Sequence, residues 1–132
     1  MKQKAEKTKL PLTPLVFHFL FTMRDGKKHG YGIMQRVKKD TDGLIKIGPG
    51  SVYGLIKKML DEGVIEEVEN DADEDLYPTF QEQNRRYYQL TVAGNVLLSQ
   101  EISRLYHIIT LFHQATFEKP VDAEDASVTE EE

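Results

Sequence analysis

The sequence predicts a small, mainly α-helical (α+β) fold with one domain. Three observations lead to this prediction. Apolar residues recur at the three- and four-residue spacing of a helix in four separate stretches. Two short runs, at 64–68 and 85–90, have the β-branched or aromatic content of strands. The length of 132 residues is that of a single domain with a modest core.

The composition excludes several classes of protein. The chain has no cysteine, so it can form neither a disulfide nor a thiolate metal site. No apolar run approaches the roughly 18 residues of a membrane-spanning helix, so we expect a cytoplasmic protein with no membrane partner. The four histidines have no i, i+4 partners among themselves, and no phosphate-cradling glycine motif is present. We therefore predict no catalytic residue, no metal site and no cofactor.

The charge is unevenly distributed along the chain. The formal net charge is −5, yet residues 1–58 contain thirteen Lys and Arg against four Asp and Glu, which gives +9. Residues 59–84 contain ten acidic and no basic residues, and residues 118–132 contain seven acidic residues and one lysine. A basic N-terminal half favours nucleic-acid binding, for which the distribution of charge matters more than its sum.

The first helix is expected to begin at Thr13 and Pro14, a capping residue followed by a proline suited to the first turn. Residues 15–23 are apolar nearly all round, which indicates a central core helix or one that lies partly in a subunit interface. Residues 1–10 are basic and poor in apolar side chains, so we expect a flexible arm.

The second helix is expected to open at residues 29–32, where paired glycines suggest a tight entry or a close approach of the backbone to a ligand or phosphate. Residues 44–47 form a short β-compatible segment, and a hard turn at 48–50 follows it. The predicted inner face of this helix consists of Tyr31, Ile33, Met34 and Val37.

The third helix is expected between Ser51 and Gly63. Ser51 can cap its start through the side-chain hydroxyl, and Gly63 suits the left-handed position just past its end. Tyr53, Lys57 and Lys58 fall on the outer face, which could enter a DNA major groove. The same pattern is also that of an ordinary amphipathic surface helix. The apolar stripe consists of Val52, Leu55, Ile56, Met59 and Leu60.

The two predicted strands enclose a long, acidic hairpin tip at residues 69–84, whose composition predicts mobility. Arg85 and Arg86 alternate across the second strand, so only one of them can point at DNA while the other could pair with the acidic loop. Tyr87 and Tyr88 alternate in the same way, so we expect one of them to face the core.

The last helix is expected after Thr91, over residues 92–117, with a disordered acidic tail at 118–132. Its length of roughly 40 Å, at 1.5 Å per residue, is too great for so small a domain to cover. The 4-3-4-3 spacing of its apolar residues is typical of a coiled-coil seam and predicts a homodimer. The predicted seam consists of Leu98, Ile102, Leu105, Ile109 and Phe112.

The order of these elements predicts a winged helix-turn-helix domain at 11–91 with a long C-terminal dimerisation helix, because a helical pair with an outward second member precedes a hairpin. Three blocks of residues also resemble PadR-family transcriptional regulators. They are HGYGI at 29–33, GSVY at 50–53 leading to LDEGVI at 60–65, and RRYYQLTVAG at 85–94. The resemblance covers roughly residues 12–115. It implies repression of a nearby operon and, in some members, release by a small molecule.

The resemblance also implies which residues meet DNA. Tyr53 would reach a phosphate through its hydroxyl, and Lys58 is expected to contact phosphates as well. The other contacts would be made by Ser51 and Lys57 in the major groove, by Arg85 and Arg86 beside the wing, and by His29 and Tyr31 near the backbone at the second helix's N-terminus.

The sequence departs from the family's pattern in three ways. Gly54 stands where the family often has proline, the wing tip is longer and more acidic than DNA binding favours, and the chain has no tryptophan. We predict a sequence-specific, DNA-binding transcriptional regulator, acting on double-stranded DNA as a homodimeric repressor that a small-molecule effector could release. The alternative is a winged-helix module that binds protein and not DNA. The acidic wing and tail favour this alternative, and the basic N-terminal half opposes it.

Overall fold

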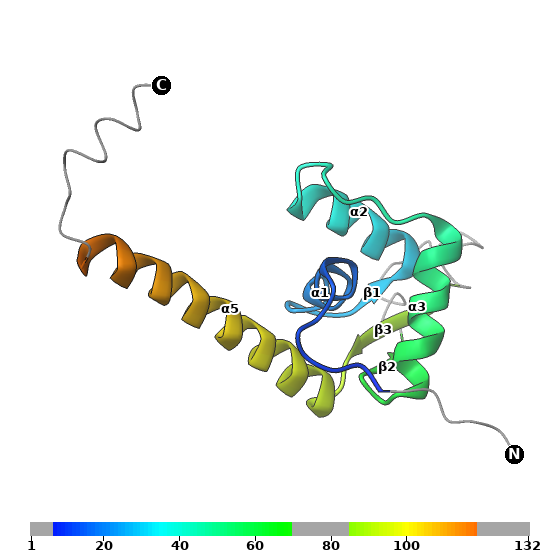
Figure 1. Ribbon diagram of the computed structural model, residues 1–132. Helices are drawn as coiled ribbons and strands as arrows, with labels where there is room; N and C mark the ends of the chain where they lie inside the picture. Colours follow the sequence, from blue (N-terminus) through cyan, green and yellow to red (C-terminus); the bar gives the residue numbers. More distant parts are fainter. Residues whose placement is uncertain (1–6, 70–84, 119–132) are drawn as a thin grey trace, which may run out of the picture. The chain divides into compact units, whose positions relative to one another are not determined.

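The computed structural model describes residues 7–69 and 85–118. It is a winged helix-turn-helix that continues into one long helix (Figure 1), which confirms the predicted fold class. Three strands form one antiparallel sheet in the order β1-β3-β2. The elements in chain order are α1 Pro14–Phe21, β1 Lys28–His29, α2 Gly30–Asp40, α3 Pro49–Asp61, β2 Ile65–Val68, β3 Tyr87–Leu90 and α5 Val92–Glu118.

The chain divides into two compact units, Met1–Glu101 and Ile102–Glu132. The core of the first unit is built around α1, which has α2, α3 and the sheet around it (Figure 1). Thr13 caps α1 as predicted, because its Oγ1 accepts a hydrogen bond from the Val16 amide. The fully or almost fully buried apolar residues of the three helices are Phe19, Leu20, Ile33, Val37, Val52, Ile56 and Met59.

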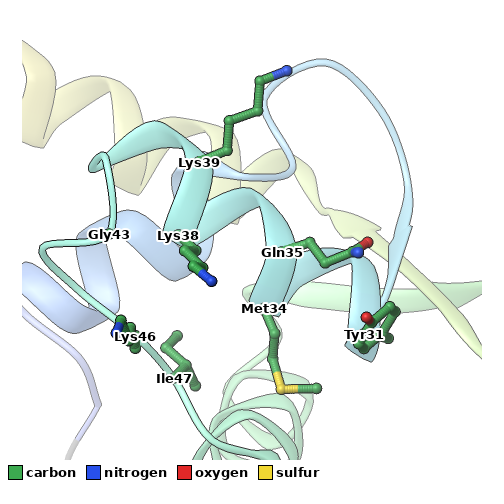
Figure 2. Close-up of a pocket in the computed structure, with 8 residues that line it drawn as sticks. All are labelled: Tyr31, Met34, Gln35, Lys38, Lys39, Gly43, Lys46 and Ile47. Atoms are coloured by element: carbon green, nitrogen blue, oxygen red, sulfur yellow. The ribbon is translucent and has the colours of Figure 1, made fainter.

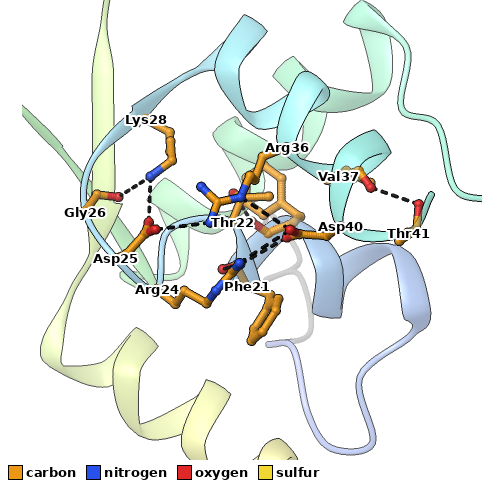
Figure 3. Close-up of polar contacts among 11 residues, drawn as sticks. Phe21, Thr22, Arg24, Asp25, Gly26, Lys28, Arg36, Val37, Asp40 and Thr41 are labelled. Carbon is orange, nitrogen blue, oxygen red and sulfur yellow. Dashed lines mark hydrogen bonds and ion pairs between the residues drawn. The ribbon is translucent and has the colours of Figure 1, made fainter. Parts of the chain in front are cut away.

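A polar network fixes the connection between α1 and α2 (Figure 3). Arg24 Nη1 lies 3.0 Å from Asp40 Oδ2, and Arg36 bridges Asp40 and Asp25 at 3.3 Å and 3.1 Å. Lys28 Nζ adds a contact of 2.9 Å to Asp25. Hydrogen bonds from Lys28 and Arg36 hold the pKa of Asp25 well below its ordinary value. The network therefore anchors the residues that lead into β1 against α2.

The short strand β1 was not predicted. Lys28 and His29 pair with Tyr88 and Tyr87 of β3, which makes the expected two-stranded hairpin a three-stranded sheet. His29 is also the N-cap of α2, because its Nδ1 accepts a hydrogen bond of 3.0 Å from the Gly32 amide. One residue thus ends a strand and begins a helix, which fixes its ring at the edge of the sheet.

The predicted inner face of α2 is wrong at Tyr31. Ile33 and Val37 are fully buried and Met34 is partly buried, but Tyr31 is 52% exposed. Positions that are two residues apart in the sequence, such as Tyr31 and Ile33, point about 200° apart around a helix. A helix that buries Ile33 and Val37 must therefore present Tyr31 to solvent.

The predicted strand at residues 44–47 does not form. Thr41 follows α2, and its hydroxyl accepts the Ile45 amide at 3.0 Å while contacting the Val37 carbonyl at 2.9 Å. These local side-chain bonds hold a turn in place of an extended segment. Within that turn Leu44 is 85% exposed and only Ile47 is buried.

The helix α3 begins three residues earlier than a cap at Ser51 would require, so Ser51 is not its cap. The N-cap is Gly48, which makes no side-chain hydrogen bond, and Pro49 occupies the first turn, where its fixed φ is already helical. The predicted C-terminal end is correct. Gly63 has φ +76°, and the amides of Gly63 and Val64 bond back to Leu60 and Met59, as in a Schellman motif.

The helix α5 is tied to the end of α3 at its first turn. Thr91 caps it as predicted, because its Oγ1 accepts the Gly94 amide at 3.0 Å. The same hydroxyl lies 2.6 Å from the Gly63 carbonyl, and the Thr91 amide donates to the Val64 carbonyl at 3.0 Å. The start of α5 is therefore fixed relative to the recognition-helix candidate α3.

The described end of the predicted flexible arm at 1–10 makes contacts with the rest of the domain. The Thr8 amide donates to Glu62 Oε1 at 2.8 Å, and Leu10 packs against the core. Nearby, the buried carboxylate of Glu101 accepts the Leu12 amide at 3.1 Å. Hydrogen bonds thus hold this segment against α3 and α5. Residues 1–6, the predicted wing tip at 70–84 and the tail from 119 lie outside the described residues.

The second unit consists, in its described part, of α5 from Ile102 onward. Leu98 belongs to the core of the first unit, where it is 5% exposed, so it is not available to a partner helix. The exposed apolar residues of this unit are Ile102, Tyr106, Ile108, Ile109, Leu111 and Phe112.

None of the helices within residues 7–69 and 85–118 is long and apolar enough to cross a membrane.

Candidate nucleic-acid interface

A hollow of about 280 Å³ lies where the start of α2 meets α3 and β3. Five of the eight predicted DNA contacts line it, although they come from three separate parts of the chain. The hollow therefore gathers residues that the sequence analysis could only treat as separate motifs. Its lining consists of His29, Gly30, Tyr31, Tyr53, Arg85, Arg86 and Tyr88.

The position of Tyr53 depends on Gly30. A Cβ atom at position 30 would lie 2.6 Å from the Tyr53 hydroxyl oxygen and 2.7 Å from its ring, too close for any side chain. The predicted close approach at the paired glycines is thus made by a tyrosine of α3. Tyr53 remains 52% exposed, so its hydroxyl sits at the rim of the hollow beside the first turn of α2.

His29 faces hydrogen-bond donors on both sides of its ring. Its Nδ1 lies 3.0 Å from the Gly32 amide, and its Nε2 lies 3.0 Å from Arg85 Nη1. Burial and the Arg85 charge lower the pKa of His29 below its ordinary value, which favours the neutral ring. A neutral imidazole has one proton and one acceptor nitrogen. Whichever nitrogen carries the proton, one of the two contacts joins two donors.

This arrangement lacks an acceptor. An oxygen that could accept hydrogen bonds from both His29 Nε2 and Arg85 Nη1 would relieve the conflict. The amides of Gly30 and Tyr31 lie in the first turn of α2, where the helix dipole favours a negative charge. The chemistry of the hollow therefore suits an anion with oxygen acceptors, such as a phosphate group.

The two arginines of the wing have different surroundings. Arg86 Nη1 lies 3.1 Å from Glu67 on the neighbouring strand β2, so part of its charge is compensated. No carboxylate within the described ranges forms an ion pair with Arg85, which contacts His29 instead. Arg85 is therefore the stronger candidate for contact with an anion.

The three predicted residues of α3 other than Tyr53 lie outside this hollow. Ser51 is exposed in the first turn, and Lys57 is 80% exposed in its side chain, 3.8 Å from Asp61. Lys58 Nζ is engaged by Glu62 Oε2 at 2.8 Å and by the Thr8 hydroxyl at 3.3 Å. Ser51 and Lys57 thus remain accessible, whereas Lys58 also helps to hold the N-terminal segment.

Two residues of the hollow were not predicted as contacts, Gly30 and Tyr88. Tyr88 is 5% exposed, so it is the tyrosine of the pair that faces the core, although it also lines the hollow. Gly30 was visible in the paired-glycine motif, but which side chain approaches it depends on tertiary structure. Among the residues that the structure describes, no cluster of three His, Asp or Glu side chains could hold a metal ion.

The fold and this hollow are those of a winged helix-turn-helix protein. The transcriptional regulator PadR-like family matches residues 19–100. Because this match covers more than half of the chain, the chain belongs to the PadR-like family, which consists of transcriptional regulators and not of enzymes. The resemblance found in the sequence is thereby confirmed. Comparison with curated proteins gave no match.

Solved structures show the same fold at low sequence identity. The structure of *Bacillus subtilis* PadR in complex with operator DNA is 24% identical, with a TM-score of 0.52, and the match covers 67% of this chain and 46% of that chain. A PadR-like regulator from *Bacillus cereus* is 18% identical (TM-score 0.56; 79% and 91% covered). A transcriptional regulator from *Clostridium thermocellum* is 19% identical (TM-score 0.55; 74% and 85% covered).

Proposed function

We propose that this chain is a sequence-specific DNA-binding repressor that acts as a homodimer in the cytoplasm. The observation that carries the proposal is the acceptor-deficient pair of His29 and Arg85 beside the Tyr53 hydroxyl. A DNA phosphate supplies oxygen acceptors and negative charge together, which is what these donors lack. The hollow would thus position the duplex against the exposed face of α3.

Base recognition is assigned to α3. An α-helix fits the DNA major groove, and Ser51 and Lys57 are the predicted contacts that lie on its exposed face. The face has few side chains of the kind that read bases directly, so part of the specificity is expected from DNA shape. A protein of the same fold, Bacillus subtilis PadR, has been solved in complex with operator DNA, which supports DNA as the partner.

Dimerisation is assigned to α5. Ile102, Leu105, Ile109 and Phe112 keep the seam spacing, and the first, third and fourth of them are 42%, 53% and 70% exposed. Burying such side chains against a second helix removes apolar surface from water, worth about 25 cal/mol per Å². Repression then follows from occupation of a promoter by the dimer, and a small-molecule effector would act by changing how the two α3 helices are spaced.

The arginine pair of the wing provides the test of the phosphate site. Arg85→Gln should weaken binding to all duplexes by a similar factor and lower the salt slope by about one unit per subunit. The matched control, Arg86→Gln, removes a charge that already faces Glu67 and should have a smaller effect. The measurement is the dissociation constant at several salt concentrations, for a duplex selected from a random pool.

Two outcomes would contradict the proposal. Equal effects of the two variants would mean that no phosphate binds at the His29–Arg85 pair. Failure of the unaltered protein to bind any duplex at low salt would favour the protein-binding module instead.

A further inference from the structure

A second and larger hollow lies on the other side of Tyr31, between α2 and the turn that leads to α3 (Figure 2). Its volume is about 600 Å³, within the range of small-molecule sites. The DNA-binding proposal uses only Tyr31 from this lining. The hollow is lined by Tyr31, Met34, Gln35, Lys38, Lys39, Gly43, Lys46 and Ile47.

Three lysines from two elements line this hollow. Lys38 and Lys39 come from the last turns of α2, and Lys46 comes from the turn that follows; Figure 2 shows the Lys39 side chain extending away from the other lining side chains. Across residues 7–69 and 85–118, no carboxylate forms an ion pair with any of the three. Asp40, the nearest acidic residue of α2, is instead paired with Arg24. The hollow therefore has uncompensated positive charge.

The hollow also has an apolar floor. The Met34 thioether and the Ile47 side chain both line it (Figure 2), and Ile47 is 7% exposed. A bare phosphate of the DNA backbone would use the lysines but would gain nothing from this floor. A ligand with one acidic group and an apolar body would use both, because apolar surface gains free energy when it leaves water.

We propose that this hollow binds a small organic anion, namely a carboxylate, sulfonate or phosphate ester with an aryl or alkyl body. Lys38 and Lys46 would both contact the acidic group, one from α2 and one from the turn, and Gln35 could donate a hydrogen bond to it. Met34 and Ile47 would contact the apolar body. This ligand site is separate from any effector position between two α5 helices.

Occupation of this hollow would oppose DNA binding. Tyr31 lines both hollows, and Ile47 directly precedes Gly48, the N-cap of α3. A ligand in contact with Tyr31 and Ile47 would therefore touch both the first hollow and the start of α3. It would also neutralise the charge of nearby lysines. This regulatory part rests on the proposed function, whereas the binding site itself does not.

The site can be tested in the full chain by NMR of methionine methyl groups. Naphthalene-2-sulfonate serves as the probe. It should shift the Met34 methyl signal in a saturable way and leave the buried Met23 and Met59 methyls nearly unchanged. Inorganic phosphate, which has charge but no apolar body, and neutral naphthalene-2-sulfonamide should both bind at least tenfold more weakly.

Charge variants test the assigned lysines. The double variant Lys38→Gln/Lys46→Gln should weaken probe binding about five- to tenfold, as expected for two partly exposed ion pairs. The control Lys57→Gln, on α3 and outside the hollow, should not. The proposal is overturned if phosphate shifts Met34 as strongly as the probe does, which would indicate a site for charge alone. It is equally overturned if the double variant binds the probe unchanged.

A competition experiment separates this proposal from the DNA-binding one. Saturating probe should weaken binding of a selected duplex severalfold in the unaltered protein, and this sensitivity should be lost in Lys38→Gln/Lys46→Gln. If the chain binds no duplex, the proposed function fails while the Met34 titration still decides whether the site exists. If the probe binds Met34 without affecting the duplex, the regulatory part is wrong.

Discussion

Gly30 and Tyr53 are interlocked, and a cycle of two substitutions can measure this. Gly30→Ala would place a Cβ 2.6 Å from the Tyr53 hydroxyl and force the ring to move. Both Gly30→Ala and Tyr53→Phe should weaken duplex binding by about 1 kcal/mol, the contribution of one hydrogen bond. Because they remove the same contact, the double variant should be little worse than either single one. Additive losses would show that the two residues act independently.

The lowered pKa of Glu62 predicts how the free energy of unfolding depends on pH. Burial acts to raise the pKa of Glu62, but hydrogen bonds from Lys58 and Thr8 prevail and lower it below its ordinary value of 4.5. A lowered carboxyl pKa stabilises the fold above pH 4.5, and this stabilisation is lost as the pH falls through the folded-state pKa. At pH 7, Glu62→Gln should reduce the free energy of unfolding by about 1 kcal/mol.

The difference between Glu62→Gln and the unaltered protein should shrink steadily below pH 4.5, because the unaltered carboxylate then becomes protonated. Urea unfolding at a series of pH values measures it. Asp61→Asn is the matched control, because its carboxylate is exposed and lies 3.8 Å from Lys57. A difference that stays constant with pH would mean that the charge of Glu62 does not matter.

The roles of single residues were predictable where a local rule applied, and the predictions were wrong where packing decided the outcome. Thr13 and Thr91 were assigned as caps because the capping bond depends on neighbours within three residues. Ser51 was assigned by the same rule, but the preceding Gly48-Pro49 already starts the helix. Tyr31 was assigned to the core because it is apolar in part, whereas only the burial of its neighbours fixes its face.

At the scale of elements, long periodic segments were predictable and short ones were not. The helices α3 and α5 carry enough turns for their apolar stripes to be unambiguous. The two-residue strand β1 has no periodicity of its own and exists only because Lys28 and His29 pair with β3, almost sixty residues later. Residues 44–47 have a strand-like composition but no partner strand, so the Thr41 side chain decides their conformation.

The exposed stripe of α5 should determine the oligomeric state. Leu105→Asp/Ile109→Asp would place two charges in the proposed seam, where burial without a partner is costly. We expect a monomer in sedimentation analysis. The control Ser103→Asp/Gln114→Asp changes exposed polar positions of the same helix and should leave the dimer intact. A double seam variant that still sediments as a dimer would place the interface elsewhere.

At the scale of the whole molecule, the operator should reflect the symmetry of the dimer. Two α3 helices related by a two-fold axis should meet successive major grooves about 34 Å apart, so the half-sites of an imperfect palindrome should be about ten base pairs apart. The monomeric Leu105→Asp/Ile109→Asp variant should protect one half-site in a footprint and bind far more weakly. Protection of both half-sites by a monomer would exclude this arrangement.

The whole-molecule contacts are also those that the sequence could least reveal. Leu12 and Glu101 are 89 residues apart, yet a buried carboxylate joins them at 3.1 Å. The three blocks that line the first hollow were each visible as motifs, but periodicity and capping rules say nothing about which motifs meet. The resemblance to a known family assigned Tyr53, Arg85 and His29 to contacts with DNA, but it did not say that they line one hollow, and it said nothing about the second hollow.

The tyrosines that line the first hollow should also make the intrinsic fluorescence of the protein sensitive to what binds there. The chain has six tyrosines and no tryptophan, so its intrinsic ultraviolet fluorescence comes from tyrosine alone. Tyr31, Tyr53 and Tyr88, half of that number, line the one hollow where a phosphate is proposed to bind. An anion that accepts a hydrogen bond from a phenol alters its emission. Occupancy of the hollow could therefore be followed in real time with unlabelled protein, and Tyr53→Phe would identify the responding ring.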